Sequence, residues 1–245
     1  MVARLILVLG KNGQVATSLY RLLNNKVHYL SSKELDLRFP PSIAETLEKF
    51  DFEVLINCTA YNNVDRAEID PREAMLINAE SVKELSRISK QRDKPFLHIS
   101  TDYVFDGKKG KYNEDSKTNP INNYGKSKLL GEEYVREVCN KYLILRTSWV
   151  YSNFGNNFLT MILKSVNKKE IYGAEDCFGS PTNSSTIAEF ISYVVPGLIK
   201  NQYDSGLYHL TDKGRTSRYN FIKEILKNIK NPTAKLRKVR NSFFD

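Results

Sequence analysis

The segment LILVLGKNGQVA, residues 5–16, decides the fold. Its first five residues are an unbroken apolar run, which is typical of a strand buried on both faces. Gly10 and Gly13 follow, three residues apart, and they let the backbone turn sharply and approach a pyrophosphate group at the start of the next helix. Ala16 is small enough for that helix to pack closely on the strand. Directly after a first strand, this GxxGxxA spacing favours a dinucleotide-binding turn over an ordinary strand–helix turn.

The same alternation of strand and helix continues from this turn as far as Arg146. Apolar, strand-like runs lie at residues 5–9, 27–30, 53–57, 95–100 and 142–146. Helical patterns lie between them, at residues 14–23, 43–50, 73–92 and 124–138. Strict alternation predicts βαβ units, and therefore an α/β fold with a doubly wound, Rossmann-type parallel sheet and helices on both faces.

The alternation loosens after Arg146. Helical patterns at residues 154–168, 185–200 and 216–230 enclose short strand-like runs near 170–173 and 206–210. We therefore expect an NAD(P)-binding Rossmann domain over residues 1–150. Residues 151–245 are expected to form a small, mixed C-terminal substrate lobe that depends on the first domain for its core.

Composition excludes several classes of protein. Hydrophobic residues make up 41% of the 245 residues and charged residues 27%, as in ordinary globular domains. No apolar run approaches the roughly 18 residues that span a bilayer, so no membrane role is expected. The three cysteines are far apart, which argues against a disulfide framework and a metal site. A reducing, cytoplasmic location is the default.

The net charge of +9 is concentrated near the C-terminus. Residues 213–245 contain ten Lys and Arg against two acidic residues, whereas the other 212 residues contain 27 basic and 26 acidic ones. The body of the protein is therefore not a surface for nucleic acid. The basic segment KLRKVR at 235–240 could touch an acidic ligand, but we expect it to be solvated.

The end of the second strand bears on the choice of cofactor. An acidic residue there would hold the ribose 2′-hydroxyl of NAD, and the segment that follows Leu30 is Ser31-Ser32-Lys33. Two hydroxyls and a lysine suit a 2′-phosphate, so the sequence favours NADPH over NADH. Further on, Asp36 could accept a hydrogen bond from the adenine amino group, or it could simply stabilise a turn.

Small and hydroxyl-bearing residues follow the third and fourth strands. Thr59 and Ala60 would let a cofactor pass close to the backbone. Ser100 and Thr101 place hydroxyl groups at the carboxyl edge of the sheet, where ligands of open α/β sheets bind. In a turn such hydroxyls often only satisfy backbone groups.

Tyr124 and Lys128 lie four residues apart, on one face of a predicted helix. A tyrosine titrates near pH ~10, and lowering its pKa by about three units needs roughly 4 kcal/mol of preference for the phenolate. A nearby ammonium supplies such a preference. A hydroxyl from Ser100 or Thr101 could then orient a substrate carbonyl, so the set predicts proton donation to a carbonyl compound.

These stretches together resemble one family. The chain is similar to the extended short-chain dehydrogenases/reductases and, among them, to the dTDP-4-dehydrorhamnose reductases. The matching segments are GKNGQVA (10–16), NCTAYNNVDRAE (57–68), STDYVFDG (100–107), NNYGKSKLLGE (122–132), LRTSWVY (145–151) and GSPTNS (179–184). They follow the family's order and cover the chain to about residue 230.

The resemblance implies an NAD(P)H-dependent reduction of a 4-keto-6-deoxyhexose on a nucleoside diphosphate. It makes Tyr124 the proton donor, Lys128 its partner and Thr101 the third catalytic residue, with Asp102 and Trp149 contacting the nucleotide sugar. Without it, Trp149 would be taken for a core aromatic. The implied cofactor-binding residues are Gly10, Gly13, Gln14, Val15, Asp36, Leu37, Ala60, Tyr61, Asn62, Ile99, Ser100, Thr101, Tyr124 and Lys128.

The chain also departs from the family pattern. The acidic residue at the end of the second strand is missing, and the chain stops where family members generally continue, so we expect a shortened substrate lobe. Two alternatives stay open: a reductase of UDP-linked hexuloses, and a non-catalytic, NADP-binding regulatory subunit like the β subunit of methionine adenosyltransferase. A homodimer is an expectation from the family alone.

Overall fold

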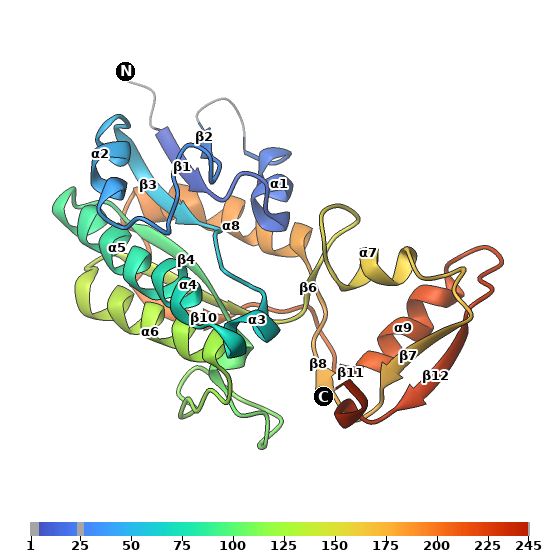
Figure 1. The fold of residues 1–245 in the computed structure, drawn as a ribbon. Coiled ribbons are helices and arrows are strands. Elements are labelled where there is room, and N and C mark those ends of the chain that lie inside the picture. Colours follow the sequence, from blue (N-terminus) through green and yellow to red (C-terminus); the bar gives the residue numbers. More distant parts are fainter. Residues whose placement is uncertain (1–4, 24–26, 245) are drawn as a thin grey trace. The chain divides into compact units, whose positions relative to one another are not determined.

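The computed structural model describes residues 5–23 and 27–244. Its chain divides into two compact units, which are considered separately (Figure 1). The first comprises Met1–Thr147 and Ala188–Leu210, and the second Ser148–Ile187 and Thr211–Asp245.

The first unit is built on a six-stranded sheet in the order β10-β5-β4-β3-β1-β2, in which every pair of neighbours is parallel. The strands are β1 (Leu5–Leu9), β2 (Val27–Leu30), β3 (Phe52–Asn57), β4 (Phe96–Thr101), β5 (Tyr142–Thr147) and β10 (Gly206–His209). The order reverses direction at β1, because β2 lies on one side of it and β3 on the other. The predicted doubly wound α/β fold is confirmed.

Helices cover the two faces of this sheet. Figure 1 shows α5 and α6 in front of the strands and α8 behind them. A core of apolar side chains lies between the layers. Leu7, Phe52 and Phe96 belong to it and have no exposed surface. The helical segments are α1 (Gln14–Tyr20), α2 (Ser42–Glu48), α3 (Val64–Ile69), α4 (Arg72–Met75), η1 (Leu76–Glu80, a π-helical stretch), α5 (Ser81–Gln91), η2 (Asp102–Val104), α6 (Asn123–Val138) and α8 (Ser184–Ile199).

The second unit has its own small core, in which Ile162, Ile171 and Ile222 are buried together. Its helices are α7 (Phe158–Leu163), α9 (Arg218–Lys227) and η3 (Asn241–Phe244). Its strands are β6 (Val150–Tyr151), β7 (Glu170–Ala174), β8 (Phe178–Gly179), β9 (Thr182–Asn183), β11 (Thr216–Ser217) and β12 (Lys235–Val239), which form three two-stranded sheets.

The division of the chain differs from the expected one at two places. Residues 148–150, expected in the first domain, belong to the second unit. Residues 188–210, which the sequence placed in the C-terminal lobe, belong to the first unit. The reason is strand pairing: Leu207 of β10 lies opposite Ile144 of β5 and extends the main sheet. A short strand pattern does not reveal its partner, so the sequence placed β10 in the wrong unit.

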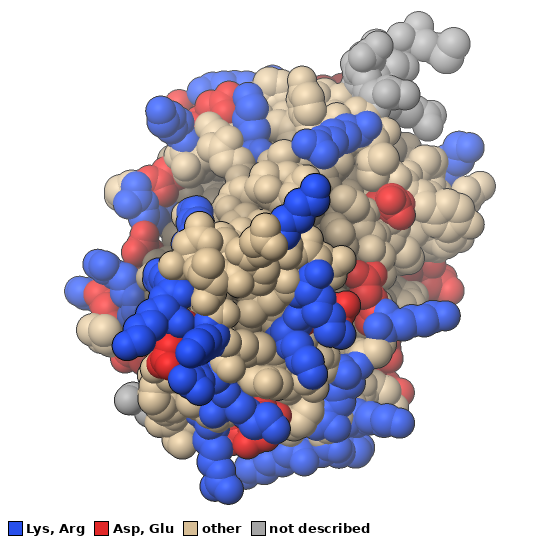
Figure 2. Space-filling model, turned by 90° about the vertical axis from the view of Figure 1, so that its right-hand side faces the viewer, with Lys and Arg blue, Asp and Glu red and all other residues tan. Residues whose placement is uncertain are grey.

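The basic C-terminal segment forms the edge strand β12. Arg237 pairs with Glu170 at 2.8 Å, and Lys238 pairs with Glu175 at 3.1 Å. Figure 2 shows Lys and Arg side chains across this face of the molecule, with acidic side chains among them. Charged side chains on an edge strand discourage pairing with a strand of another chain. The basic residues of β12 can therefore be explained by the fold, without an acidic ligand. Within the described residues, no helix is long and apolar enough to cross a membrane.

Candidate active site

The glycine turn lies where the strand order reverses. Gly10 has φ of +90°, and a side-chain Cβ there would lie 3.1 Å from the backbone carbonyl of Cys58, at the end of β3. Gly13 precedes α1, and among the described residues no side chain caps this helix start. The turn therefore brings backbone close to backbone at the switch point, immediately before α1. These features fit the pyrophosphate of a dinucleotide.

The end of β2 holds an acidic residue after all. The N–H groups of Gly10 and Lys11 both donate to the Leu30 carbonyl, which ties the glycine turn to β2. Glu34 then folds back, and its Oε2 accepts hydrogen bonds from the N–H and the hydroxyl of Ser31, at 2.9 and 2.7 Å. These bonds hold the pKa of Glu34 below its usual value. The interpretation that no acid is present at this place was wrong, because a tight turn brings Glu34 back to Ser31, three positions earlier in the chain.

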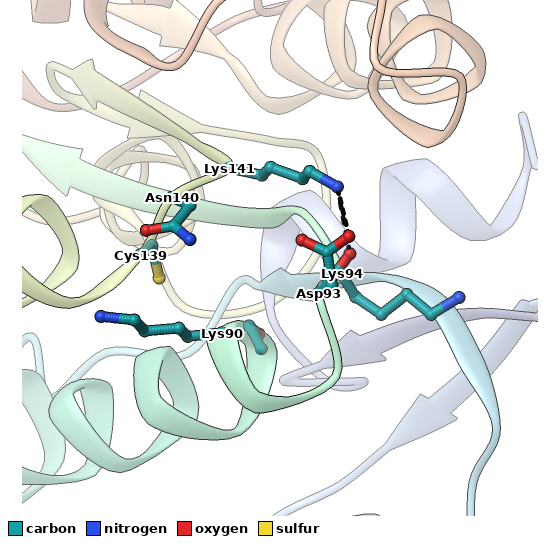
Figure 3. A pocket seen from close by; sticks show the side chains of 7 residues that line it. Lys90, Asp93, Lys94, Cys139, Asn140 and Lys141 are labelled. Carbon is teal, nitrogen blue, oxygen red and sulfur yellow. Dashed lines mark hydrogen bonds and ion pairs between the residues drawn. The ribbon is translucent and has the colours of Figure 1, made fainter.

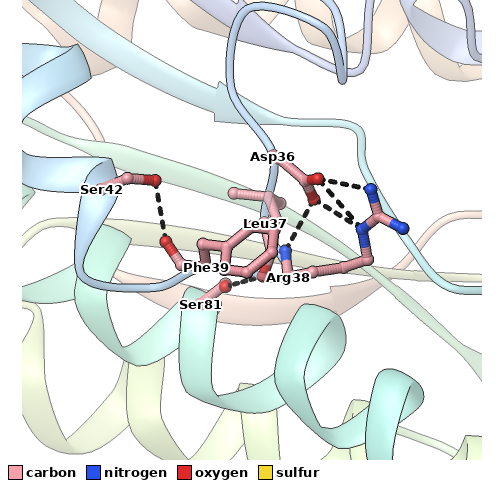
Figure 4. Close-up of polar contacts among 6 residues, drawn as sticks. All are labelled: Asp36, Leu37, Arg38, Phe39, Ser42 and Ser81. Atoms are coloured by element: carbon pink, nitrogen blue, oxygen red, sulfur yellow. Dashed lines mark hydrogen bonds and ion pairs between the residues drawn. The ribbon is translucent and has the colours of Figure 1, made fainter.

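Asp36 is engaged by its neighbour. Both carboxylate oxygens accept hydrogen bonds from the Arg38 guanidinium, at 2.5–3.0 Å, and the Arg38 N–H donates to Oδ1 (Figure 4). Arg38 thereby lowers the pKa of Asp36. The Leu37 side chain is buried, while its carbonyl accepts a hydrogen bond from the Ser81 hydroxyl. These contacts suffice for a turn aspartate, and contact of Asp36 and Leu37 with the adenosine remains a prediction.

Asn78 fixes the loop after β3, where Ala60, Tyr61 and Asn62 lie. Its amide accepts a hydrogen bond from the Tyr61 N–H and donates one to the Tyr61 carbonyl, both at 2.9 Å. Its Nδ2 also lies 3.0 Å from the Ser127 hydroxyl on α6. Sequence reasoning missed Asn78. The available signal was a polar residue within an otherwise apolar helical face.

Tyr124 lies at the start of α6. The Asn122 side chain caps this helix by accepting from the Gly125 N–H at 2.7 Å, and the ring of Tyr103 stands perpendicular to that of Tyr124, 5.5 Å away. The Thr101 hydroxyl acts on the phenol as a hydrogen-bonding group, and it accepts from the Tyr103 N–H at 3.2 Å. Burial raises the pKa of Tyr124, the bond with Thr101 lowers it, and the charge of Asp102 raises it further. The expected lowering by Lys128 is not present, and the net direction is upward.

Lys128 is buried one turn further along α6, with 1% of its surface exposed. Its Nζ donates to the Ile99 carbonyl at 2.7 Å and lies 3.3 Å from Nε2 of His98. Burial lowers the pKa of Lys128 to about 8, against an opposing effect of Glu132. The ammonium therefore points toward β4, which explains why it does not stabilise a phenolate at Tyr124.

A buried ion pair lies beneath these groups. Arg146 on β5 bonds Glu132 on α6 through Nε and Nη2, at 2.9 and 2.6 Å, and the two side chains are 4% and 1% exposed. The Ser100 hydroxyl donates to the same carboxylate at 2.5 Å. Ser100 is thus turned inward, which leaves Thr101 as the hydroxyl beside Tyr124. The sequence did not predict a role for Glu132 or Arg146.

We expect Gly125→Ala to disturb Tyr124. A Cβ at residue 125 would lie 2.2 Å from the Tyr103 carbonyl oxygen, so α6 would have to move away from η2. Overpacking of this kind costs about 1–3 kcal/mol, and we expect the loss to be measurable by urea denaturation. Lys126→Ala, at the exposed next position, is the control and should change stability little. Equal stability of both variants would contradict the close contact.

Trp149 lies in the second unit and is half-buried. Its backbone has φ of +45°, its ring packs against Gly179, and the guanidinium carbon of Arg218 stands 3.5 Å above the ring centroid. A tryptophan in the left-handed region is strained, which points to a local role rather than to core packing. Arg218 was not among the predicted site residues.

A small pocket lies at the other ends of the strands. It is lined by residues that precede β4 and β5, including Asp93, Lys94 and Lys141 (Figure 3). Lys141 pairs with Asp93 at 2.7 Å. Because ligands of parallel sheets bind at the carboxyl ends of the strands, we assign this pocket no part in the site.

The parallel sheet, the glycine turn at its switch point and the Tyr124/Lys128 helix before β5 define a short-chain dehydrogenase/reductase of the extended type. Its family model is the RmlD substrate binding domain, which matches residues 4–244. The chain belongs to this family, that of the dTDP-4-dehydrorhamnose reductases, which are NAD(P)H-dependent oxidoreductases. The resemblance seen in the sequence motifs is confirmed.

Named relatives agree with this assignment. The chain is 39% identical over 229 residues to the dTDP-4-dehydrorhamnose reductase of Burkholderia thailandensis, covering 90% of this chain and 77% of that protein. It is 36% identical to the reductase of Escherichia coli K12, covering 88% and 75%. The solved structure of the Bacillus anthracis reductase in complex with NADP is 31% identical, with a TM-score of 0.90 over 99% of this chain and 86% of that one.

Proposed function

We propose that this protein reduces the C4 keto group of dTDP-4-dehydro-L-rhamnose to give dTDP-L-rhamnose, with Tyr124 as the proton donor. The observation that carries the proposal is the Thr101 hydroxyl at the carboxyl end of β4, which acts on the Tyr124 phenol and lowers its pKa, with Lys128 buried one turn away. In a member of this reductase family, that arrangement suits a carbonyl substrate.

Thr101, Tyr124 and Lys128 have different roles in this reaction. Thr101 holds the carbonyl oxygen with its hydroxyl, and Tyr124 passes its proton to that oxygen as negative charge develops. Lys128 carries its positive charge beneath these groups, where its Nζ bonds the Ile99 carbonyl of β4. The nicotinamide, when bound, supplies the hydride for C4. Asp102 and Trp149 contact the nucleotide sugar.

The dinucleotide would lie along the switch point. The glycine turn, with Gly10, Gly13, Gln14 and Val15, would hold the pyrophosphate, and Ala60, Tyr61 and Asn62 would lie beside the cofactor together with Ile99 and Ser100. The raised pKa of Tyr124 fits a donor that keeps its proton at neutral pH until an alkoxide forms next to it. We place the reaction in the cytoplasm.

Cofactor oxidation tests the proposal. Purified protein is mixed with dTDP-4-dehydro-L-rhamnose and either NADPH or NADH, and loss of the reduced nicotinamide is followed by absorbance. Turnover that yields dTDP-L-rhamnose is expected. Tight cofactor binding without turnover would contradict the proposal. It would leave UDP-linked hexuloses to be tried as substrates, and then a regulatory, non-catalytic role.

The end of β2 should set the preference between the two cofactors. We propose that NADPH is preferred, with Lys33 facing the 2′-phosphate. Lys33→Ala should then reduce kcat/KM for NADPH about tenfold, corresponding to about 1.4 kcal/mol, and leave that for NADH unchanged. Glu34→Gln removes a negative charge at the same place. It should therefore raise the ratio of kcat/KM for NADPH to kcat/KM for NADH, which Lys33→Ala lowers. Equal effects on both cofactors would refute this assignment.

A further inference from the structure

Asn57 and His98 form a buried pair beneath the site, on the neighbouring strands β3 and β4. Neither residue has exposed surface, and Nδ2 of Asn57 lies 3.2 Å from Nδ1 of His98. The other ring nitrogen, Nε2, lies 3.3 Å from Nζ of Lys128. The mechanism above uses neither Asn57 nor His98.

The orientation of the Asn57 amide is fixed by Thr59. Oδ1 of Asn57 accepts hydrogen bonds from the backbone N–H of Thr59, at 3.0 Å, and from its hydroxyl. A flipped amide would turn its NH₂ group against the Thr59 N–H, so the NH₂ group must be the one that faces His98. An amide nitrogen can only donate.

That orientation decides the tautomer of His98. Because Nδ1 faces a donor, it must be the acceptor nitrogen of the ring, and the proton of the neutral imidazole is then on Nε2. Burial and the charge of Lys128 both lower the pKa of His98, so the ring is neutral. His98 therefore turns an N–H group toward Nζ of Lys128.

An ammonium group has three donors and no acceptor. The Nε2–H of His98 thus disfavours the protonated form of Lys128, because two donors face each other. The neutral amine of Lys128 can instead accept a hydrogen bond from this Nε2–H. We propose that His98 is a positioning residue of the reductase: held by Asn57 in the Nε2–H tautomer, it makes the Lys128 ammonium release its proton more readily.

The charged and titratable groups around Lys128 are few. Tyr124 and Glu132 lie on α6 itself, His98 on β4, and Arg146 on β5, where its charge is matched by Glu132. Asp102 acts on Tyr124 from η2. Glu132 favours the ammonium and burial acts against it. His98 is the group of this set whose N–H faces Nζ.

This inference rests on the proposed function for its consequence. After Tyr124 has given its proton to the substrate oxygen, the phenolate must recover one. Lys128 is the proton source in this proposal: its Nζ would turn from the Ile99 carbonyl toward the phenolate and lose a proton that restores the phenol, and the amine would be reprotonated from water. An ammonium that releases its proton readily favours this transfer. At high pH Lys128 is already deprotonated, and the reaction is then limited by the lack of this proton.

The tautomer can be measured directly, without turnover. Protein labelled with ¹⁵N-histidine gives two ring-nitrogen signals for His98, which are assigned by their disappearance in His98→Gln. We expect the protonated nitrogen to be Nε2 and the unprotonated one to be Nδ1. The opposite tautomer overturns the proposal, whether or not the protein reduces dTDP-4-dehydro-L-rhamnose.

The pH profile tests the effect on Lys128. In the wild type, kcat/KM for dTDP-4-dehydro-L-rhamnose should fall as pH rises past about 8, where Lys128 loses its proton. His98→Gln offers the ammonium an amide oxygen, so we expect the basic limb to move upward by about one pH unit, a tenfold change in the dissociation constant. His209→Gln, the same change on β10 of the same sheet, should leave the limb in place. An unmoved limb in folded His98→Gln protein overturns the proposal, whereas failure of the wild type to turn over counts against the proposed function alone.

Discussion

Tyr124→Phe is expected to lower kcat for the reduction by about a thousandfold, within the 10²–10⁴ range of general acid catalysis. The substitution removes only the hydroxyl that Thr101 bonds, and the ring can keep its perpendicular contact with Tyr103. We therefore expect cofactor affinity, measured by nicotinamide fluorescence, to remain within a few-fold of the wild type.

Tyr134→Phe is the matched control for this experiment. Tyr134 lies on the same helix, and its hydroxyl bonds Glu80 at 3.3 Å on the exposed side. That variant should keep full activity. If Tyr124→Phe instead retained more than about a tenth of the wild-type kcat, water or another group would be the donor, and the role proposed for Tyr124 would be wrong.

Glu132→Gln is expected to destabilise the protein by about 3–5 kcal/mol, because it leaves the buried Arg146 guanidinium without its counter-charge. The carboxylate also accepts from Ser100, so β4 and β5 both lose their common partner on α6. Urea denaturation followed by circular dichroism measures the change.

Two comparisons make this result interpretable. Glu84→Gln removes a partly exposed partner of Arg87 on α5 and should cost no more than about 1 kcal/mol. Replacing both buried partners, as in Glu132→Met with Arg146→Leu, should recover part of the lost stability, since no uncompensated charge remains. A small effect of Glu132→Gln, equal to that of Glu84→Gln, would show that the buried pair is not what stabilises this region.

Local patterns were sufficient to predict much of the fold. An apolar run of five residues followed by glycines three apart predicted β1 and its turn, and the alternation of runs predicted β2 to β5 and the helices between them. These features depend on neighbours in the chain. The placement of Tyr124 and Lys128 on one helix follows from the same kind of local spacing.

Features that depend on distant residues were not predictable. The pairing of β10 with β5, the hydrogen bonds of Asn78 to Tyr61 and the contact of Asn57 with His98 join residues 17 to 63 positions apart. The direction of the Lys128 ammonium was also not predictable from local spacing. The four-residue spacing suggested that it would face Tyr124, yet a backbone carbonyl of β4 holds it.

The chain passes between the two units more than once, and this limits which fragments of the protein can fold. The polypeptide leaves the first unit after Thr147, re-enters it at Ala188 and leaves again after Leu210. No single cut separates the two units. A fragment ending at residue 150 would lack α8 and β10, so the hydrogen-bonding groups of β5 and the apolar surface that α8 covers would meet solvent. Such a fragment should be insoluble, and a recombinant sheet unit would need the segment 188–210 joined back to it by a designed linker.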